Sequence, residues 1–194
     1  MPRYGDAVDS VMSMRPESPR ISEVGLTEVH FTIRAITASD EPSMAGLLEK
    51  LWGSRNVVTR GVIYDAGKLP GFLAVEGDAV VGLLTLRYNG RECEVITVDA
   101  LVQRKGIGAA LLAAAQREAR NHGCARMWLI TTNDNLGAFA FYQKQGMRMS
   151  AVYPDALTEA RKLKPQIHLI AENGIPIRDE VEFELDLIVP NNQL

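Results

Sequence analysis

The stretch that decides the fold is Gln103-Arg104-Lys105-Gly106-Ile107-Gly108. It follows an apolar run typical of a strand, residues 95–102, and opens a strong helix pattern that runs from Ala109 to Asn121. A strand that turns through glycines into a helix leaves backbone N–H groups unpaired at the helix start, where the helix dipole also favours negative charge. Gly106 and Gly108 leave room for an anion to approach the backbone. The stretch therefore predicts a binding site for a pyrophosphate.

Two common pyrophosphate loops do not match this stretch. A Walker-type loop ends in Gly-Lys-Ser/Thr, and that triplet is absent here. A dinucleotide-binding loop has a third glycine three residues after the second, where this chain has Leu111. What remains is Gln-x-x-Gly-x-Gly after an interior strand. A tight strand-to-helix turn without a ligand is the alternative interpretation of so short a motif.

The composition limits the classes of protein to which the chain can belong. Its 194 residues suit one domain, and a hydrophobic content of 46% is enough for a full core. The net charge of -3 argues against a nucleic-acid partner. No run reaches the ~18 apolar residues of a membrane span, so no membrane partner is expected.

The cysteines and histidines point to a cytoplasmic protein without a metal. Cys93 and Cys124 lie in apolar runs and are expected to be reduced core thiols rather than a disulfide. The three histidines are scattered, without the spacing of metal ligands.

Hydrophobic periodicity predicts the order of elements along the chain. Residues 1–28 have no clear period and are interpreted as a flexible arm, with a dimerisation or regulatory arm, and hence a homodimer, as the alternative. The domain then covers residues 29–194. Strands are predicted at 29–36, 72–76, 79–88, 92–101, 124–131, 147–153 and 181–189. Helices are predicted at 37–53, 109–121 and 135–146, a helix-prone insertion at 154–165, a loop at 166–179, and a short helix or loop at 54–70.

A second motif accompanies the glycine stretch, Asn135-x-x-Ala138-x-x-Phe141-Tyr142-x-x-x-Gly146. Three antiparallel strands before the glycine loop differ from a parallel dinucleotide-binding fold. The two motifs, on these elements and in this order, resemble the GNAT superfamily of acyl-CoA-dependent N-acetyltransferases over residues 31–189. The resemblance implies an α/β (α+β) fold, a mixed and mostly antiparallel sheet of six to seven strands flanked by helices. Gln103 and Arg104 stand where many members have Arg and Gly, although other members share the glutamine.

The resemblance implies acetyl-CoA as cosubstrate and direct attack by a primary amine in a ternary complex. Main-chain groups of Ile96, Thr97 and Val98 would bind pantetheine and the acyl carbonyl. The loop Gln103, Arg104, Lys105, Gly106, Ile107 and Gly108 would bind the phosphates. Asn135, Ala138 and Tyr142 lie along one stripe of a helix and would flank the pantetheine arm. Asn135 as a simple helix cap, and solvated Arg104 and Lys105, are the alternative interpretations.

Two residues are predicted to be catalytic. Tyr142 stands where the family places a tyrosine beside the coenzyme A sulfur, and would act as the acid; a core aromatic is the alternative. Glu92 lies eleven residues before Gln103, where the histone-modifying branch carries its glutamate base. Period-two spacing puts Glu92 and Glu94 on one strand face with Ile96 and Val98. Glu94, Asp99 or a water chain are alternative bases.

The acceptor is left open, as a small-molecule amine or a protein amine. The family's acceptor groove maps to the first helix region and to residues 154–180, which are mixed in charge. Phe31, Trp52 and Trp128 are expected in the core. A catalytically inert acyl-CoA-binding or protein-interaction module of the same fold is the alternative function.

Overall fold

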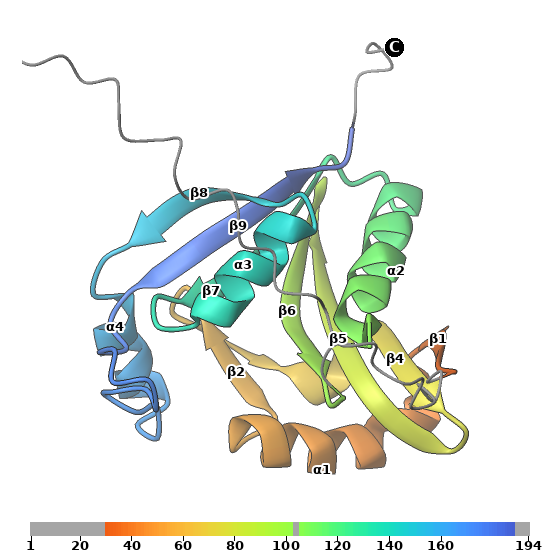
Figure 1. Ribbon diagram of the computed structural model, residues 1–194, viewed down its shortest axis with the longest axis horizontal. Coiled ribbons are helices and arrows are strands. Elements are labelled where there is room, and N and C mark those ends of the chain that lie inside the picture. Colours follow the sequence, from red (N-terminus) through yellow and green to blue (C-terminus); the bar gives the residue numbers. More distant parts are fainter. Residues whose placement is uncertain (1–29, 103–104, 189–194) are drawn as a thin grey trace, which may run out of the picture.

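A computed structural model describes residues 30–102 and 105–188, and the predicted arm lies outside them. Its main feature is a seven-stranded sheet of order β1-β4-β5-β6-β7-β9-β8 (Figure 1). The strands are β1 (Thr32–Ala35), β4 (Gly71–Glu76), β5 (Ala79–Asn89), β6 (Glu92–Ala100), β7 (Arg126–Thr132), β8 (Arg148–Tyr153) and β9 (Glu180–Asp186). Among the strands that the structure describes, only β6 and β7 pair in parallel. The predicted mixed, mostly antiparallel sheet is confirmed.

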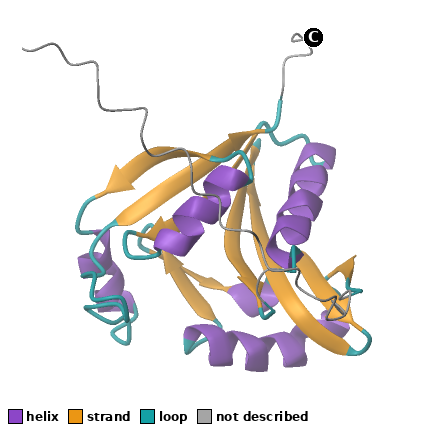
Figure 2. Cartoon of the chain, in the orientation of Figure 1, coloured by secondary structure: helices purple, strands orange, loops and turns teal. Residues whose placement is uncertain are grey.

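Helices and a small hairpin cover the two faces of the sheet (Figure 2). The helices are α1 (Glu41–Trp52), α2 (Ile107–Asn121), α3 (Leu136–Lys144) and α4 (Ala156–Leu163), and the hairpin is β2 (Asn56–Thr59) with β3 (Val62–Asp65). Apolar side chains of α2 and α3 form one core with one sheet face, around Leu111 and Phe183. Those of α1 and β2 form a second core on the other face, around Leu48 and Leu83.

Residues 54–70, predicted as a short helix or a loop, contain the β2–β3 hairpin, which was not predicted, and then a short 3-10 helix, η2 (Ala66–Lys68). The hairpin's turn residues Arg60 and Gly61 have φ of 50° and 71°, the two positive angles that a tight hairpin turn of this length favours. Arg60 is an unusual residue for this conformation. Its backbone N–H donates to the carboxylate of Glu180, at 3.3 Å and 3.4 Å from the two oxygens, and its guanidinium stacks on Tyr153 at 3.6 Å from the ring centroid. Contacts from distant strands therefore stabilise a turn that the local sequence does not predict.

A β-bulge in β6 determines which face of the sheet the side chains in the second half of that strand take. Thr85 of β5 pairs with Thr97, but Leu86 pairs with Val95, so Ile96 is the extra residue. The alternation of faces changes there: Ile96 packs in the α1 core, whereas Val98 packs against the α2–α3 core, as Val95 does. The expected common face for Glu92, Glu94, Ile96 and Val98 is therefore wrong for Val98.

At the same point β6 and β7 separate. Their parallel pairing runs from Glu92 with Arg126 to Val95 with Leu129, and stops there. Both strands continue, β6 to Ala100 and β7 to Thr132. Backbone groups of residues 96–100 that face β7 have no strand partner, and buried backbone groups need one. The fork between the two strands is thus suited to a ligand that can supply hydrogen bonds.

Candidate active site

The fork opens into a pocket of about 670 Å³, a volume typical of small-molecule sites. Its floor is formed by the diverging ends of β6 and β7, and its walls by the end of α1, by β2, and by α4 with the loop that follows. The lining residues that carry polar side chains are Trp52, Thr59, Thr97, Asp99, Thr131, Thr132, Asn135, Tyr142, Lys164, Gln166, His168 and Glu180.

The structure brings the three predicted β6 residues to this pocket. Ile96, Thr97 and Val98 all line it. Their side chains are engaged elsewhere: Ile96 is in the α1 core, and the Thr97 hydroxyl lies 2.9 Å from that of Thr85. What they can offer to a ligand is therefore the unpaired backbone, as the sequence interpretation requires.

The glycine stretch forms the start of α2. Gly106 is the residue before the helix. Its φ of 76° is unfavourable for any residue that has a Cβ. Ile107 is 1% exposed, so it can contribute only its backbone N–H to an anion site. Lys105 is exposed beside the helix start. Gln103 and Arg104 lie outside the described residues, so their predicted phosphate contacts stay predictions.

Gly108 has a packing role in addition to the phosphate contact that its place in the motif predicts, and that contact stays a prediction. A Cβ built on Gly108 would lie 3.1 Å from Cζ of Phe141 on α3, whereas one on Gly106 meets nothing within 4 Å. Gly108 therefore permits close packing of α2 on α3. This contact also sets the start of α2 beside the residue that precedes Tyr142.

We expect Gly108→Ala to lower the free energy of unfolding by about 1–3 kcal/mol, the cost of overpacking, because the Phe141 ring must move. Urea denaturation of the variant measures this loss. Gly108→Ala combined with Phe141→Leu serves as the control, and the alanine should cost less there. Equal losses in both backgrounds would show that Phe141 is not the obstacle.

The second motif supplies the other side of the fork. The side-chain oxygen of Asn135 accepts from the N–H of Ala138 at 3.2 Å and caps α3, and Asn135 also lines the pocket. Ala138 packs against the α2–α3 core and is not among the pocket residues. Tyr142 lines the pocket, is 8% exposed, and makes no side-chain hydrogen bond to another described residue. Burial, and then the charge of Asp99, raise the pKa of its phenol, which keeps Tyr142 a proton donor across the physiological pH range.

The structure does not bring Glu92 to the pocket. It lies at the start of β6, before the fork, with its carboxylate 3.3 Å from Arg126 and its side chain 43% exposed. Glu94 is buried, and burial raises the pKa of its carboxyl against the opposing effect of Arg87, whose guanidinium lies 3.2 Å away. Neither is among the pocket residues. The role of Glu92 as base stays a prediction that this geometry does not favour.

Besides Tyr142 and His168, three ionisable groups line the pocket. Asp99 accepts from the indole N–H of Trp52 at 3.0 Å, and burial raises the pKa of its carboxyl. Glu180, at the start of β9, is 2% exposed, and burial raises its pKa also. Lys164 donates to the backbone carbonyls of Trp52 and Asn56 at 3.0 Å and 2.9 Å, which ties α4 to α1 and β2.

Sequence reasoning named Asp99 as an alternative base and mapped residues 154–180 to the acceptor groove, but it did not single out Glu180. Trp52 was expected in the core but is 39% exposed at the pocket. Glu180 begins a run of alternating glutamates, the usual pattern of a strand with one solvated face. The pattern itself could not reveal that this face is covered by Arg60 and Tyr153. Within the described residues, no group of three or more His, Cys, Asp or Glu is placed to hold a metal, and no helix is long and apolar enough to span a bilayer.

Comparisons with known proteins bear on the family and the fold of the chain. Residues 39–147 match a model of the acetyltransferase (GNAT) family. The chain is 45% identical to the uncharacterized protein YdhI of Bacillus subtilis over 135 residues, which cover 69% of this chain and 84% of that protein.

Solved structures share the fold. An IAA acetyltransferase from Bacillus cereus superposes with a TM-score of 0.62 at 23% identity, over 81% of this chain and 99% of its own. A Bacillus subtilis acetyltransferase solved in complex with CoA gives 0.58 at 22% identity, over 82% and 100%.

Proposed function

Since the chain belongs to the GNAT family of acetyltransferases, we propose that it transfers an acetyl group from acetyl-CoA to a primary amine by direct attack in a ternary complex. The observation that carries this proposal is the fork: unpaired backbone of β6 faces Tyr142 across one pocket. A thioester placed there has hydrogen-bond partners on one side and a phenol on the other. The buried free thiols Cys93 and Cys124 support a cytoplasmic protein.

The chain's residues have separate tasks in this proposal. Backbone groups of residues 96–98 bind the pantetheine arm and stabilise charge on the acyl oxygen, which is commonly the largest catalytic contribution. The start of α2 binds the pyrophosphate through backbone N–H groups. Tyr142 gives its proton to the departing thiolate. The acceptor enters from the side of α1 and α4, where the pocket is lined by polar groups, and is held close to the thioester.

We expect acetyl-CoA to stabilise the protein against heat, and NADH and ATP to do so much less, because the loop has neither the third glycine nor the Gly-Lys-Ser/Thr end that those ligands favour. A ligand at 100 times its dissociation constant adds about 2.7 kcal/mol. Thermal denaturation with each ligand measures the shift. A shift with NADH as large as that with acetyl-CoA would contradict the acyl-CoA assignment.

The function itself is tested by screening primary amines while following the release of free coenzyme A. The screen spans small amines, amino acids and peptides with free N-termini or lysines. Amine-dependent release with at least one acceptor is the expected result. Stabilisation by acetyl-CoA without release for any amine would instead indicate an inert acyl-CoA-binding module.

A further inference from the structure

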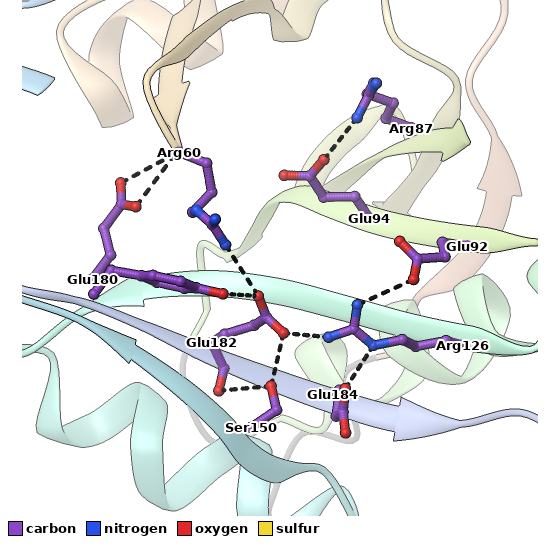
Figure 3. A network of polar contacts seen from close by, with 10 residues as sticks. Arg60, Arg87, Glu92, Glu94, Arg126, Ser150, Glu180, Glu182 and Glu184 are labelled. Atoms are coloured by element: carbon purple, nitrogen blue, oxygen red, sulfur yellow. Dashed lines mark hydrogen bonds and ion pairs between the residues drawn. The ribbon is translucent and has the colours of Figure 1, made fainter. Parts of the chain in front are cut away.

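Three glutamates of β9 point to one face of the sheet, and two of them are fully engaged (Figure 3). Glu182 contacts Arg126 and accepts from the Tyr153 hydroxyl at 2.7 Å. Glu184 pairs with Arg148 and with Arg126, the latter at 2.6 Å. Each of these buried carboxylates faces at least one guanidinium, as buried charges normally do.

Glu180 differs from its two neighbours. Among the described residues its carboxylate has no ion pair, and its hydrogen-bond partner is the backbone N–H of Arg60, at 3.3 Å and 3.4 Å (Figure 3). The guanidinium of Arg60 is turned to Glu182, at 3.4 Å, and to the Tyr153 ring. A carboxylate can accept about four hydrogen bonds. Glu180, 2% exposed, therefore has unused capacity for a cationic donor, and burial raises the pKa of its carboxyl.

A polar group in the hairpin that contacts Glu180 has no hydrogen-bond partner among the described residues. Thr59 precedes Arg60 in the hairpin and is 6% exposed, and its buried hydroxyl has no hydrogen-bond partner in the part of the chain that the structure describes. Thr59 and Glu180 both line the pocket, whereas Glu182 and Glu184 do not. Unsatisfied buried polar groups in native proteins call for an explanation. A bound donor of several hydrogen bonds would provide one here.

We propose that Glu180, assisted by Thr59, binds the ammonium group of the acceptor and takes the proton that must leave before the amine can attack. The proposal rests on the proposed function. It adds a general base, Glu180, and a positive charge on the acceptor. The acceptor class is a primary amine that is protonated at neutral pH.

The proton balance of the step is complete. The ammonium gives one proton to Glu180, and the free lone pair forms the N–C bond with the thioester carbonyl. The C–S bond then breaks, the thiolate takes the proton of Tyr142, and Tyr142 regains a proton from the nitrogen of the new amide. Glu180 releases its proton to solvent. One ammonium and one thioester thus yield an amide, a thiol and one proton.

Asp99 is the competing carboxylate in the pocket. It already accepts a hydrogen bond from Trp52, and its charge acts on the phenol of Tyr142. It therefore lies towards the leaving thiolate, whereas Glu180 lies beside the hairpin on the far strand. The charged or titratable groups around Glu180 are Arg60 and Glu182 on the sheet face, Tyr153 on β8, Asp179 next to it, and Asp99, Tyr142, Lys164 and His168 in the pocket.

The test compares Glu180→Gln with wild type in kcat/KM for the best amine across pH. We expect the variant to lose about 10²- to 10³-fold at pH 7, within the range for a positioned base. The kcat/KM of the variant should then rise about tenfold for each unit of increasing pH, up to the pKa of an alkyl amine, about 10. The reason is that the variant can use only amine that is already deprotonated in solution. Acetyl-CoA affinity should be unchanged. Thr59→Val should raise KM more than it lowers kcat.

Glu184→Gln is the matched control, because Glu184 is a buried glutamate on the same face of β9 but outside the pocket. It should keep the wild-type pH profile even if it is less stable. A wild-type profile in Glu180→Gln would overturn the proposal. So would the predicted profile appearing in Asp99→Asn instead, which would make Asp99 the base.

A binding experiment separates this proposal from the proposed function. Butylamine and phenethylamine, with butanol and phenethyl alcohol as neutral counterparts, are added to the coenzyme A-loaded protein, and the thermal midpoint is measured. Stabilisation by an amine but not its alcohol, lost in Glu180→Gln, supports the ammonium site even if no amine is turned over. Equal effects of amines and alcohols on the wild type would overturn it.

Discussion

Replacing Gly71 by alanine should destabilise the protein by at least about 4 kcal/mol, an exceptional loss for one methyl group. Gly71 begins β4 and pairs with Thr85 of β5. A Cβ there would overlap the carbonyl oxygen of Leu84 and lie 2.9 Å from Cα of Thr85. These atoms are backbone of a central strand, so no side-chain rotation relieves the overlap. Against a total stability of roughly 5–15 kcal/mol, the loss threatens folding itself.

Urea denaturation and the thermal midpoint measure this effect. For a chain of this size, about 4 kcal/mol corresponds to roughly 10 °C. Gly46→Ala is the matched control, because Gly46 lies within α1 and a Cβ there meets nothing within 4 Å. That substitution should be neutral or stabilising by up to about 1 kcal/mol. A change below about 1 kcal/mol in Gly71→Ala would show that β4 and β5 can separate locally at no great cost.

Tyr142→Phe should lower kcat about 10²-fold while fold and acetyl-CoA affinity stay unchanged. The ring packs on Phe183, with centroids 5.5 Å apart, and the phenylalanine retains that contact. Only the hydroxyl is lost, and no described residue forms a hydrogen bond with it. A phenol has a pKa near 10 and a thiol one near 8.5. Because burial raises the pKa of Tyr142 further, donation is uphill and the gain lies at the low end for a positioned acid.

The measurement is kcat and acetyl-CoA affinity on one preparation. Tyr88→Phe is the control, since Tyr88 stacks on His122 at 4.3 Å between centroids and is not among the pocket residues. It should leave kcat unchanged. If Tyr142→Phe stays within about twofold of wild type, Tyr142 is a packing residue. If affinity falls together with kcat, it is a wall of the cofactor site.

The main features of the fold could be predicted because they depend on local patterns. Glycine turns and periodic apolar residues indicated the strands of the sheet and α1 to α3. The resemblance based on the two motifs indicated residues 96–98 as a binding segment. Arg60 shows where local reading fails: its positive φ is held by Glu180 and Tyr153, from strands that follow it by about a hundred residues. No short window of sequence contains that information.

Individual site residues were harder to predict than the elements that carry them. One extra residue at Ile96 moved Val98 to the other face, which no alternation rule anticipates. The alternating glutamates of β9 predicted a strand, but they did not predict that the glutamate side chains are buried. Burial depends on the distant residues that cover them. Glu92 was assigned by its distance from the loop along the chain, and the opening of the fork begins beyond it.

The strand order has a consequence for how the chain is made. Of the described strands β9 is the last to be synthesised, yet it lies between β7 and β8. While the ribosome still holds residues 180–186, β7 has an open edge and β8 has no neighbour in the sheet. Chains are synthesised at about 5–20 residues per second, so this half of the sheet stays open for roughly a few seconds after β8 has been made. A chain that stops before Glu180 would lose β9 and leave β8 without a partner in the sheet. It would also lose the Glu180 carboxylate of the pocket, and it would expose the unpaired backbone edge of β7 to other nascent chains.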